Sequence, residues 1–147
     1  MKKFELTSEF VTFLGKKLFR IKALISFGNV KEGELGGFVE KEENLSNDGN
    51  AWVSGDARVS GDAWVYGDAR VSGNADYATV QGFGSEYRTT TFFRTKAGDI
   101  GVRCGCFYGT LEEFRAKVKG AHGETKIAKE YLMVADLMEF RFSKEEV

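Results

Sequence analysis

The sequence lacks several features that particular classes of protein require. Its 147 residues include no proline, one histidine and two cysteines, and 21 basic side chains nearly balance 22 acidic ones. A single histidine excludes a zinc site built from three histidines of one chain. The near-zero net charge gives no general electrostatic reason to bind nucleic acid or an anionic membrane surface, so we expect neither partner.

Long hydrophobic runs are also missing: no run approaches the roughly 20 residues that a membrane span needs. The opening segment, MKKFELTSEF, alternates and is charged, which is not the pattern of a signal peptide. Cys104 and Cys106 are two residues apart, so in a strand their α-carbons would lie near the upper limit for a disulfide. We therefore expect reduced thiols, a cytoplasmic protein and no metal site.

Glycine is abundant, with 18 residues. From Ala51 to Tyr77 the segment AWVSGDARVSGDAWVYGDARVSGNADY repeats the unit Val-x-Gly-(Asp/Asn)-Ala-x every six residues. This period does not fit a helix, but it fits a short strand with inward valine and alanine, followed by a glycine corner. The inward register is Val53, Val59, Val65, Val71, Tyr77 and Phe83, with Ala51, Ala57, Ala63, Ala69 and Ala75 two residues ahead of it.

This unit resembles that of hexapeptide-repeat proteins. The resemblance implies a short left-handed parallel β-helix with three hexads per coil, assembled as a homotrimer. Val39 and Leu45 are six apart and Val53 follows Leu45 by eight, so the repeat is predicted over residues 36–83 with a two-residue insertion. The open ends of so short a stack need flanking segments to cover them.

The flanking segments are predicted to form two further units, so the expected fold is mainly β with a C-terminal α part. Residues 1–35 alternate and turn at Gly15, which predicts an N-terminal antiparallel cap. Residues 84–147 are predicted as a ββαα domain, with a turn at 96–99 between its strands. Thr110 and Glu113 form a capping box that begins its first helix.

Large and basic residues occupy the outward positions of the repeat. Three hexads per coil would stack residues eighteen apart, placing Trp52 beside Arg70 and Arg58 beside Asp76. Tryptophan and arginine are enriched at interfaces and attract each other through cation–π contacts. The candidate subunit-interface residues are Trp52, Arg58, Trp64 and Arg70. Packing between coils of one subunit is the alternative.

Catalytic groups are scarce. Hexapeptide-repeat proteins include acyltransferases that use a histidine between coils, but the one histidine, His122, lies in GAHGET between the two predicted helices. No nucleophile elbow, Walker or zincin motif is present. Asp56, Asp62 and Asp68 recur at the corners, where backbone geometry explains them and calcium is the alternative. We predict no catalytic residue and no cofactor.

A basic and aromatic segment follows the repeat. Arginine binds phosphate or carboxylate in a forked geometry, and aromatic rings stack on bases, so this combination favours a nucleotide-like ligand. The candidate ligand-binding residues are Tyr87, Arg88, Arg94, Lys96, Arg103 and Tyr108. A half-buried hairpin with ordinary solvated charges is the alternative.

Most of the chain is also similar to small proteins of bacteria and their phages, through the segments GFGSEYRTTTFF and CGCFYGTLEEF. This resemblance implies a phage or prophage accessory role in the host cytoplasm. We predict a non-catalytic trimeric binding protein, a phage anti-defence protein that sequesters a nucleotide-derived signal molecule. A protein-binding inhibitor or assembly module with a host defence protein as partner is one alternative, and a divergent acyltransferase that uses His122 is another.

Overall fold

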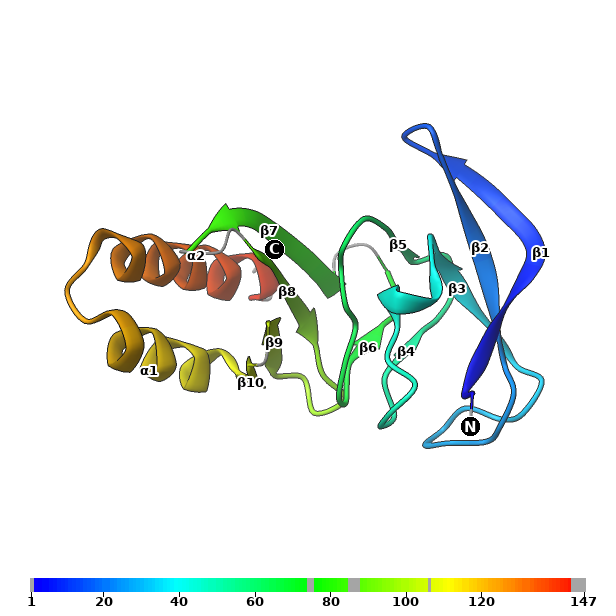
Figure 1. Cartoon of the computed structure of the whole chain (residues 1–147). Helices are drawn as coiled ribbons and strands as arrows, with labels where there is room; N and C mark the ends of the chain where they lie inside the picture. Colours follow the sequence, from blue (N-terminus) through cyan, green and yellow to red (C-terminus); the bar gives the residue numbers. More distant parts are fainter. Residues whose placement is uncertain (1, 74–75, 85–87, 106, 144–147) are drawn as a thin grey trace.

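The computed structural model arranges the chain as a row of layers, with two helices at one end and a long hairpin at the other (Figure 1). It describes residues 2–73, 76–84, 88–105 and 107–143. An antiparallel sheet and the glycine-rich repeat lie between the two ends (Figure 1). The fold is therefore mainly β with two C-terminal helices.

The first sheet begins with the hairpin of β1 (Phe4–Phe13) and β2 (Lys16–Ala23), so the predicted turn around Gly15 is confirmed. β3 (Leu35–Val39) pairs antiparallel with β2. β5 (Arg58–Val59), a strand of the repeat, pairs parallel with β3. One mixed sheet thus joins the hairpin to the repeat.

The repeat itself forms very short strands. A 3-10 turn, η1 (Glu42–Asn44), precedes β4 (Trp52–Val53), which pairs parallel with β6 (Arg70–Val71). Trp52 lies opposite Arg70, as predicted. The inward register is confirmed for eight residues whose side chains are at most 2% exposed: Val53, Val59, Val65, Val71, Ala51, Ala57, Ala63 and Ala69. Ala75 lies outside the described residues.

The second sheet is an antiparallel meander of β7 (Tyr77–Phe83), β8 (Arg88–Arg94), β9 (Ile100–Cys104) and β10 (Phe107–Thr110). It has four strands where two were predicted. Tyr77 and Phe83 keep the six-residue spacing of the repeat, but their strand, β7, pairs with β8 and not with a strand of the repeat. The predicted turn at 96–99 between β8 and β9 is confirmed.

The prediction of a left-handed parallel β-helix is wrong. The sheets are a mixed one (β1-β2-β3-β5), an antiparallel one (β10-β9-β8-β7) and a parallel pair (β4-β6). The physical reason is strand length. Each strand of the repeat has two residues, whereas the flanking hairpins supply long antiparallel ladders that draw β5 and β7 into their own sheets.

Two helices cover the outer face of the second sheet. α1 (Leu111–His122) begins at the predicted capping box, in which the Glu113 amide donates to the Thr110 hydroxyl at 3.2 Å. α2 (Lys126–Phe142) packs beside it. Arg115 of α1 donates to Asp136 and Glu139 of α2, each at 2.9 Å, which holds the helices together.

Candidate functional site

A cavity of about 320 Å³ lies between the second sheet and the two helices. It lies where β7 and β9 end and β8 begins, beside the last turns of α1. Residues from six elements line it. These residues are Phe83, Gly84, Arg88, Cys104, Phe107, Phe114, Lys117, Val118, Ala121, His122 and Tyr131.

Strand alternation decides which side chains of the sheet reach this cavity. Neighbours along a strand point to opposite faces. Phe92 and Val102 pack in the core under the helices, whereas Phe93 packs in the core of the repeat. Arg88 and Cys104 lie an even number of residues from Phe92 and Val102, so both face the helices and line the cavity.

Basic side chains surround the cavity. Arg88 comes from the start of β8, and Lys117 and His122 come from the last two turns of α1. Among the described lining residues there is no aspartate or glutamate. Positively charged side chains around a cavity favour an anionic ligand, and arginine in particular suits a phosphate or carboxylate group.

Aromatic rings form the floor and hold one another in place. Phe114 meets Tyr131 edge to face at 5.6 Å, and Phe107 meets Phe114 at 5.8 Å. His122 lies nearly parallel to Tyr131, with the ring centroids 6.4 Å apart. This floor gives a flat or apolar part of a ligand a surface for stacking.

Tyr131 is fixed as a hydrogen-bond donor. Its hydroxyl donates to the Phe83 carbonyl at 3.1 Å. Burial, with the Cys104 thiol beside it, raises the pKa of Tyr131 to about 12. The phenol therefore stays protonated at neutral pH. The Thr90 hydroxyl donates to the Cys104 sulfur at 3.1 Å, so this thiol is also oriented within the wall.

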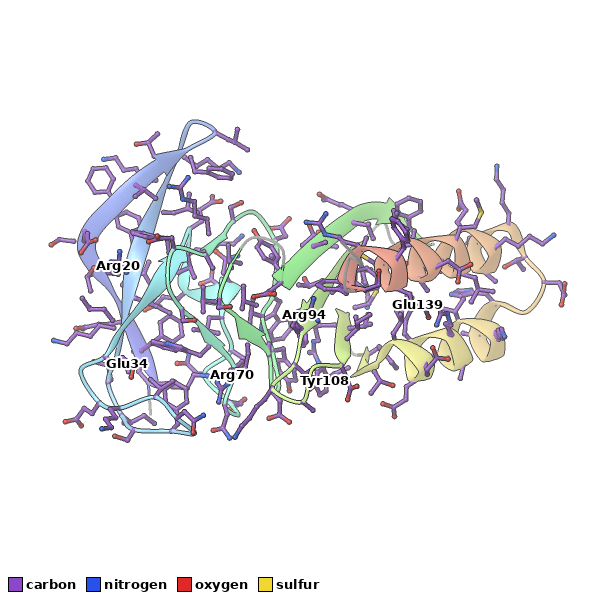
Figure 2. The ribbon with its side chains drawn as sticks, turned by 180° about the vertical axis from the view of Figure 1, so that it is seen from behind. Arg20, Glu34, Arg70, Arg94, Tyr108 and Glu139 are labelled. Carbon is purple, nitrogen blue, oxygen red and sulfur yellow. The ribbon has the colours of Figure 1, made fainter. Side chains whose placement is uncertain are left out.

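Of the five predicted ligand-binding residues that the structure describes, only Arg88 lines this cavity; Tyr87 lies outside the described residues. Arg94 instead joins the sheet to the end of α2. Its Nε donates to the Asp76 carboxylate at 3.2 Å, and its Nη2 donates to the Phe142 carbonyl at 3.2 Å. The position of Arg94 between the repeat and the helices is visible in Figure 2.

Arg103 and Tyr108 point to the opposite face, toward the repeat. The Arg103 guanidinium lies 4.1 Å from the Trp64 ring centroid and 4.4 Å from that of Tyr66. Tyr108 meets Tyr66 edge to face at 4.9 Å, and its hydroxyl accepts from the Asp68 amide at 3.4 Å. Both residues join the sheet to the repeat.

Lys96 lies at a third place. Its backbone amide donates to the Asp68 carbonyl at 2.9 Å, and it lines a cavity of about 610 Å³ together with Tyr108. Asp68 and Asp99 also line that cavity, so its charge is mixed. Another cavity, of about 570 Å³ beside Trp64, is lined by four carboxylates: Glu42, Glu43, Asp48 and Asp62. The cavity under the helices is therefore the most basic of the three.

The predicted interface residues also lie in different environments. The prediction that Trp52 points outward is wrong, because Trp52 is 3% exposed and packs edge to face on Phe27 at 5.4 Å. Trp64 is 37% exposed, and Arg103 covers one face of its ring. The other two predicted interface residues make contacts within the chain. Arg70 donates a hydrogen bond to the Asn50 carbonyl, and the Arg58 guanidinium lies 5.4 Å from the Phe13 ring centroid.

Lys117 and Tyr131 were not predicted as site residues, and His122 was placed between the two predicted helices. A signal for Lys117 exists, because it neighbours Phe114, Val118 and Ala121 on the apolar face of α1. A lysine that flanks the apolar face of a helix lies at the edge of the core. Which strand end lies beneath that lysine depends on tertiary packing.

No group of three or more potential metal ligands exists among residues 2–73, 76–84, 88–105 and 107–143. Within the same part of the chain no helix is long and apolar enough to cross a membrane. No protein-family model, no curated protein and no solved structure matches the chain. The resemblances to hexapeptide-repeat proteins and to small phage proteins therefore stay predictions.

Proposed function

We propose that this protein is a non-catalytic binding protein whose ligand is a small anion with a flat aromatic part, such as a mononucleotide. The ligand occupies the cavity between the second sheet and the helices. One observation carries the proposal: Arg88, Lys117 and His122 gather around an aromatic floor.

The size and chemistry of the cavity restrict the ligand. Its volume of about 320 Å³ lies at the small end of the range for ligand pockets, roughly 300–1,000 Å³. A mononucleotide or a compound of similar size fits this range, whereas a long oligonucleotide does not. The basic rim binds the phosphate or carboxylate, and the rings of Phe107 and Phe114 contact the flat part.

The positions of the wall residues support binding rather than catalysis. The phenol of Tyr131 is protonated and bonded to the Phe83 carbonyl, so it does not act as a base near neutral pH. The Cys104 sulfur accepts from Thr90. Sequestration of a nucleotide-derived signal for a phage is a biological role consistent with this cavity, and it rests on the sequence resemblance. The homotrimer rests on that resemblance too, and the cavity does not require it, because one chain supplies all the lining residues.

Lys117 offers the sharpest test, because Lys119 on the same helix does not line the cavity. Native mass spectrometry of the protein purified from cells should show a retained anion, which denaturation releases for identification. Isothermal titration with AMP, GMP, CMP and UMP provides a second measurement. We expect Lys117→Glu to weaken binding by at least about tenfold, or 1.4 kcal/mol, since it places a negative charge at the rim.

The control is Lys119→Glu, which makes the same change of charge on the solvent side and should bind as the wild type does. Equal weakening by both variants would mean that the effect comes from net charge, and it would contradict a site in the cavity. An empty protein that gives no heat with any of the four nucleotides would contradict the proposed ligand class.

A second candidate function is catalytic, and the place of His122 in the cavity favours it. In this case His122 acts as the general base of a divergent acyltransferase. The test is turnover of acetyl-CoA with an amine acceptor. Turnover that His122→Ala abolishes would establish this function, and a retained, chemically unchanged ligand would support the binding protein instead.

A further inference from the structure

The outer face of α2 carries an apolar stripe that nothing in the described chain covers. Met133, Leu137 and Phe140 are 70%, 56% and 79% exposed. Their spacing of four and three residues places them on one side of the helix. The core face of α2 is a separate set: Ala128, Tyr131, Val134, Ala135, Met138 and Phe142.

Such a stripe is not an ordinary surface feature. Single exposed apolar residues are common on soluble proteins, but three large ones along one helix form a contiguous patch. α2 belongs to the helical end of the molecule, away from the repeat and the long hairpin (Figure 1), and the three apolar side chains are exposed. The patch is therefore accessible to another molecule.

Charged residues beside the stripe are self-complementary. Glu130 and Arg141 are 11 residues apart, about three turns, so both lie on the same flank. The midpoint of this pair falls between residues 135 and 136, and the midpoint of Met133 and Leu137 falls at Ala135. In one antiparallel register, Glu130 therefore lies opposite Arg141 of a second copy, and Met133 lies opposite Leu137 of that copy. The two-fold symmetry repeats each of these pairs.

We propose that two copies of this chain associate through the exposed stripe of α2, antiparallel and about a two-fold axis that crosses the helix at the level of Ala135. Asp136 lies close to this axis on the other flank, where two like charges would meet. Arg115 of the same chain offsets the charge of Asp136 at 2.9 Å. Phe140 then lies over the aliphatic stem of Glu130 of the second copy.

A contact of one helix pair lies at the small end of specific interfaces, below about 1,200 Å² in total. We therefore expect a dimer with a dissociation constant in the micromolar range. Sedimentation velocity from about 1 μM to about 500 μM covers that range. The expected result is a shift from one chain mass to twice that mass as the concentration rises.

Charge exchange tests the register. Glu130→Arg places two arginines opposite each other, and Arg141→Glu places two glutamates opposite each other, so each raises the dissociation constant by at least about tenfold. The double variant restores the pairs with their signs exchanged and returns the constant close to the wild-type value. Glu124→Arg, exposed and outside α2, is the matched control and leaves it unchanged.

Leu137→Asp should give a monomer across the whole range, and its far-ultraviolet circular dichroism should stay that of the wild type because Leu137 is mostly exposed. A wild-type protein that stays monomeric, or that reaches three chain masses, would overturn the proposal. Failure of the double variant to recover association would overturn the antiparallel register.

Discussion

The two faces of the second sheet use the same four strands for different purposes. The face toward the repeat is closed: Phe93 is fully buried, and Trp64 and Tyr66 flank Arg103. The face toward the helices is closed along most of its length by Phe92 and Val102, but at the strand ends it leaves a basic cavity. The first face packs against the repeat, whereas the second packs against the helices and also has room for a ligand.

The difference teaches how to interpret a basic segment that forms strands. Arg88 and Arg103 look equivalent in sequence, since each lies in a run of aromatic and polar residues. Strand alternation sends Arg88 to the helix face and Arg103 to the repeat face. The first remains beside a cavity, and the second becomes part of the packing between layers.

The largest expected effect comes from the neighbours Phe92 and Phe93. Each is fully buried, so Phe92→Ala and Phe93→Ala should each lower the free energy of unfolding by about 3–5 kcal/mol. Denaturant unfolding measures the loss. Hydrogen exchange should locate it: Phe92→Ala loosens α1 and α2, whereas Phe93→Ala loosens the repeat around Val65 and Val71.

The matched pair provides its own control, because the two residues have the same chemistry and adjacent positions. Hydrogen exchange that increases in the same segments for both variants would show that the two faces do not unfold separately. That outcome would contradict the division between them.

Arg103 should have a smaller effect, on stability alone. Arg103→Ala removes the cation that packs on the rings of Trp64 and Tyr66, together with its aliphatic packing. We expect a loss of about 1–2 kcal/mol in the free energy of unfolding. Trp64→Ala combined with Arg103→Ala should cost less than the sum of the single variants, because the pair is lost once. Full additivity would show that the contact between Arg103 and Trp64 contributes nothing to the free energy of unfolding.

The smallest expected effect is a pH dependence at the helix face. Burial opposes ionisation of Asp76, but hydrogen bonds from Ser72 and Arg94 outweigh it and hold the pKa of Asp76 below the ordinary 3.8. A carboxylate with a lowered native pKa stabilises the fold above its unfolded pKa, and this contribution disappears as the pH falls through the native pKa.

Asp76→Asn tests this contribution. At pH 6 the variant should be less stable than the wild type by about 1 kcal/mol or less, and the difference should vanish as the pH falls below about 4. Chemical denaturation at a series of pH values measures both curves. A difference that stays constant down to pH 3 would mean that ionisation of Asp76 does not contribute.

Local features of the fold could be predicted from the sequence. The inward valines and alanines, the turn at Gly15 and the capping box of Thr110 and Glu113 all follow from short-range rules, and the structure confirms them. The pairing of the strands could not be predicted in the same way. A two-residue strand such as β5 carries too little local information to fix its partner, so the longer hairpins decide it.

The candidate site was harder to predict. Arg88 was identified by its residue type, but Lys117, His122 and Tyr131 come from helices whose placement over the sheet depends on packing between distant segments. Arg94 and Arg103 have the same residue type as Arg88, and strand alternation and ion pairing give them structural positions instead. The composition of the segment indicated a ligand, and the geometry selects which residues meet it.

The most direct test of the account compares Arg88→Ala with Arg103→Ala by native mass spectrometry of protein purified from the same cells. We predict that Arg103→Ala retains the anion that the wild type carries, although it unfolds more easily, and that Arg88→Ala loses the anion. Retention by Arg88→Ala together with loss by Arg103→Ala would contradict the account, because it would place the ligand on the face toward the repeat.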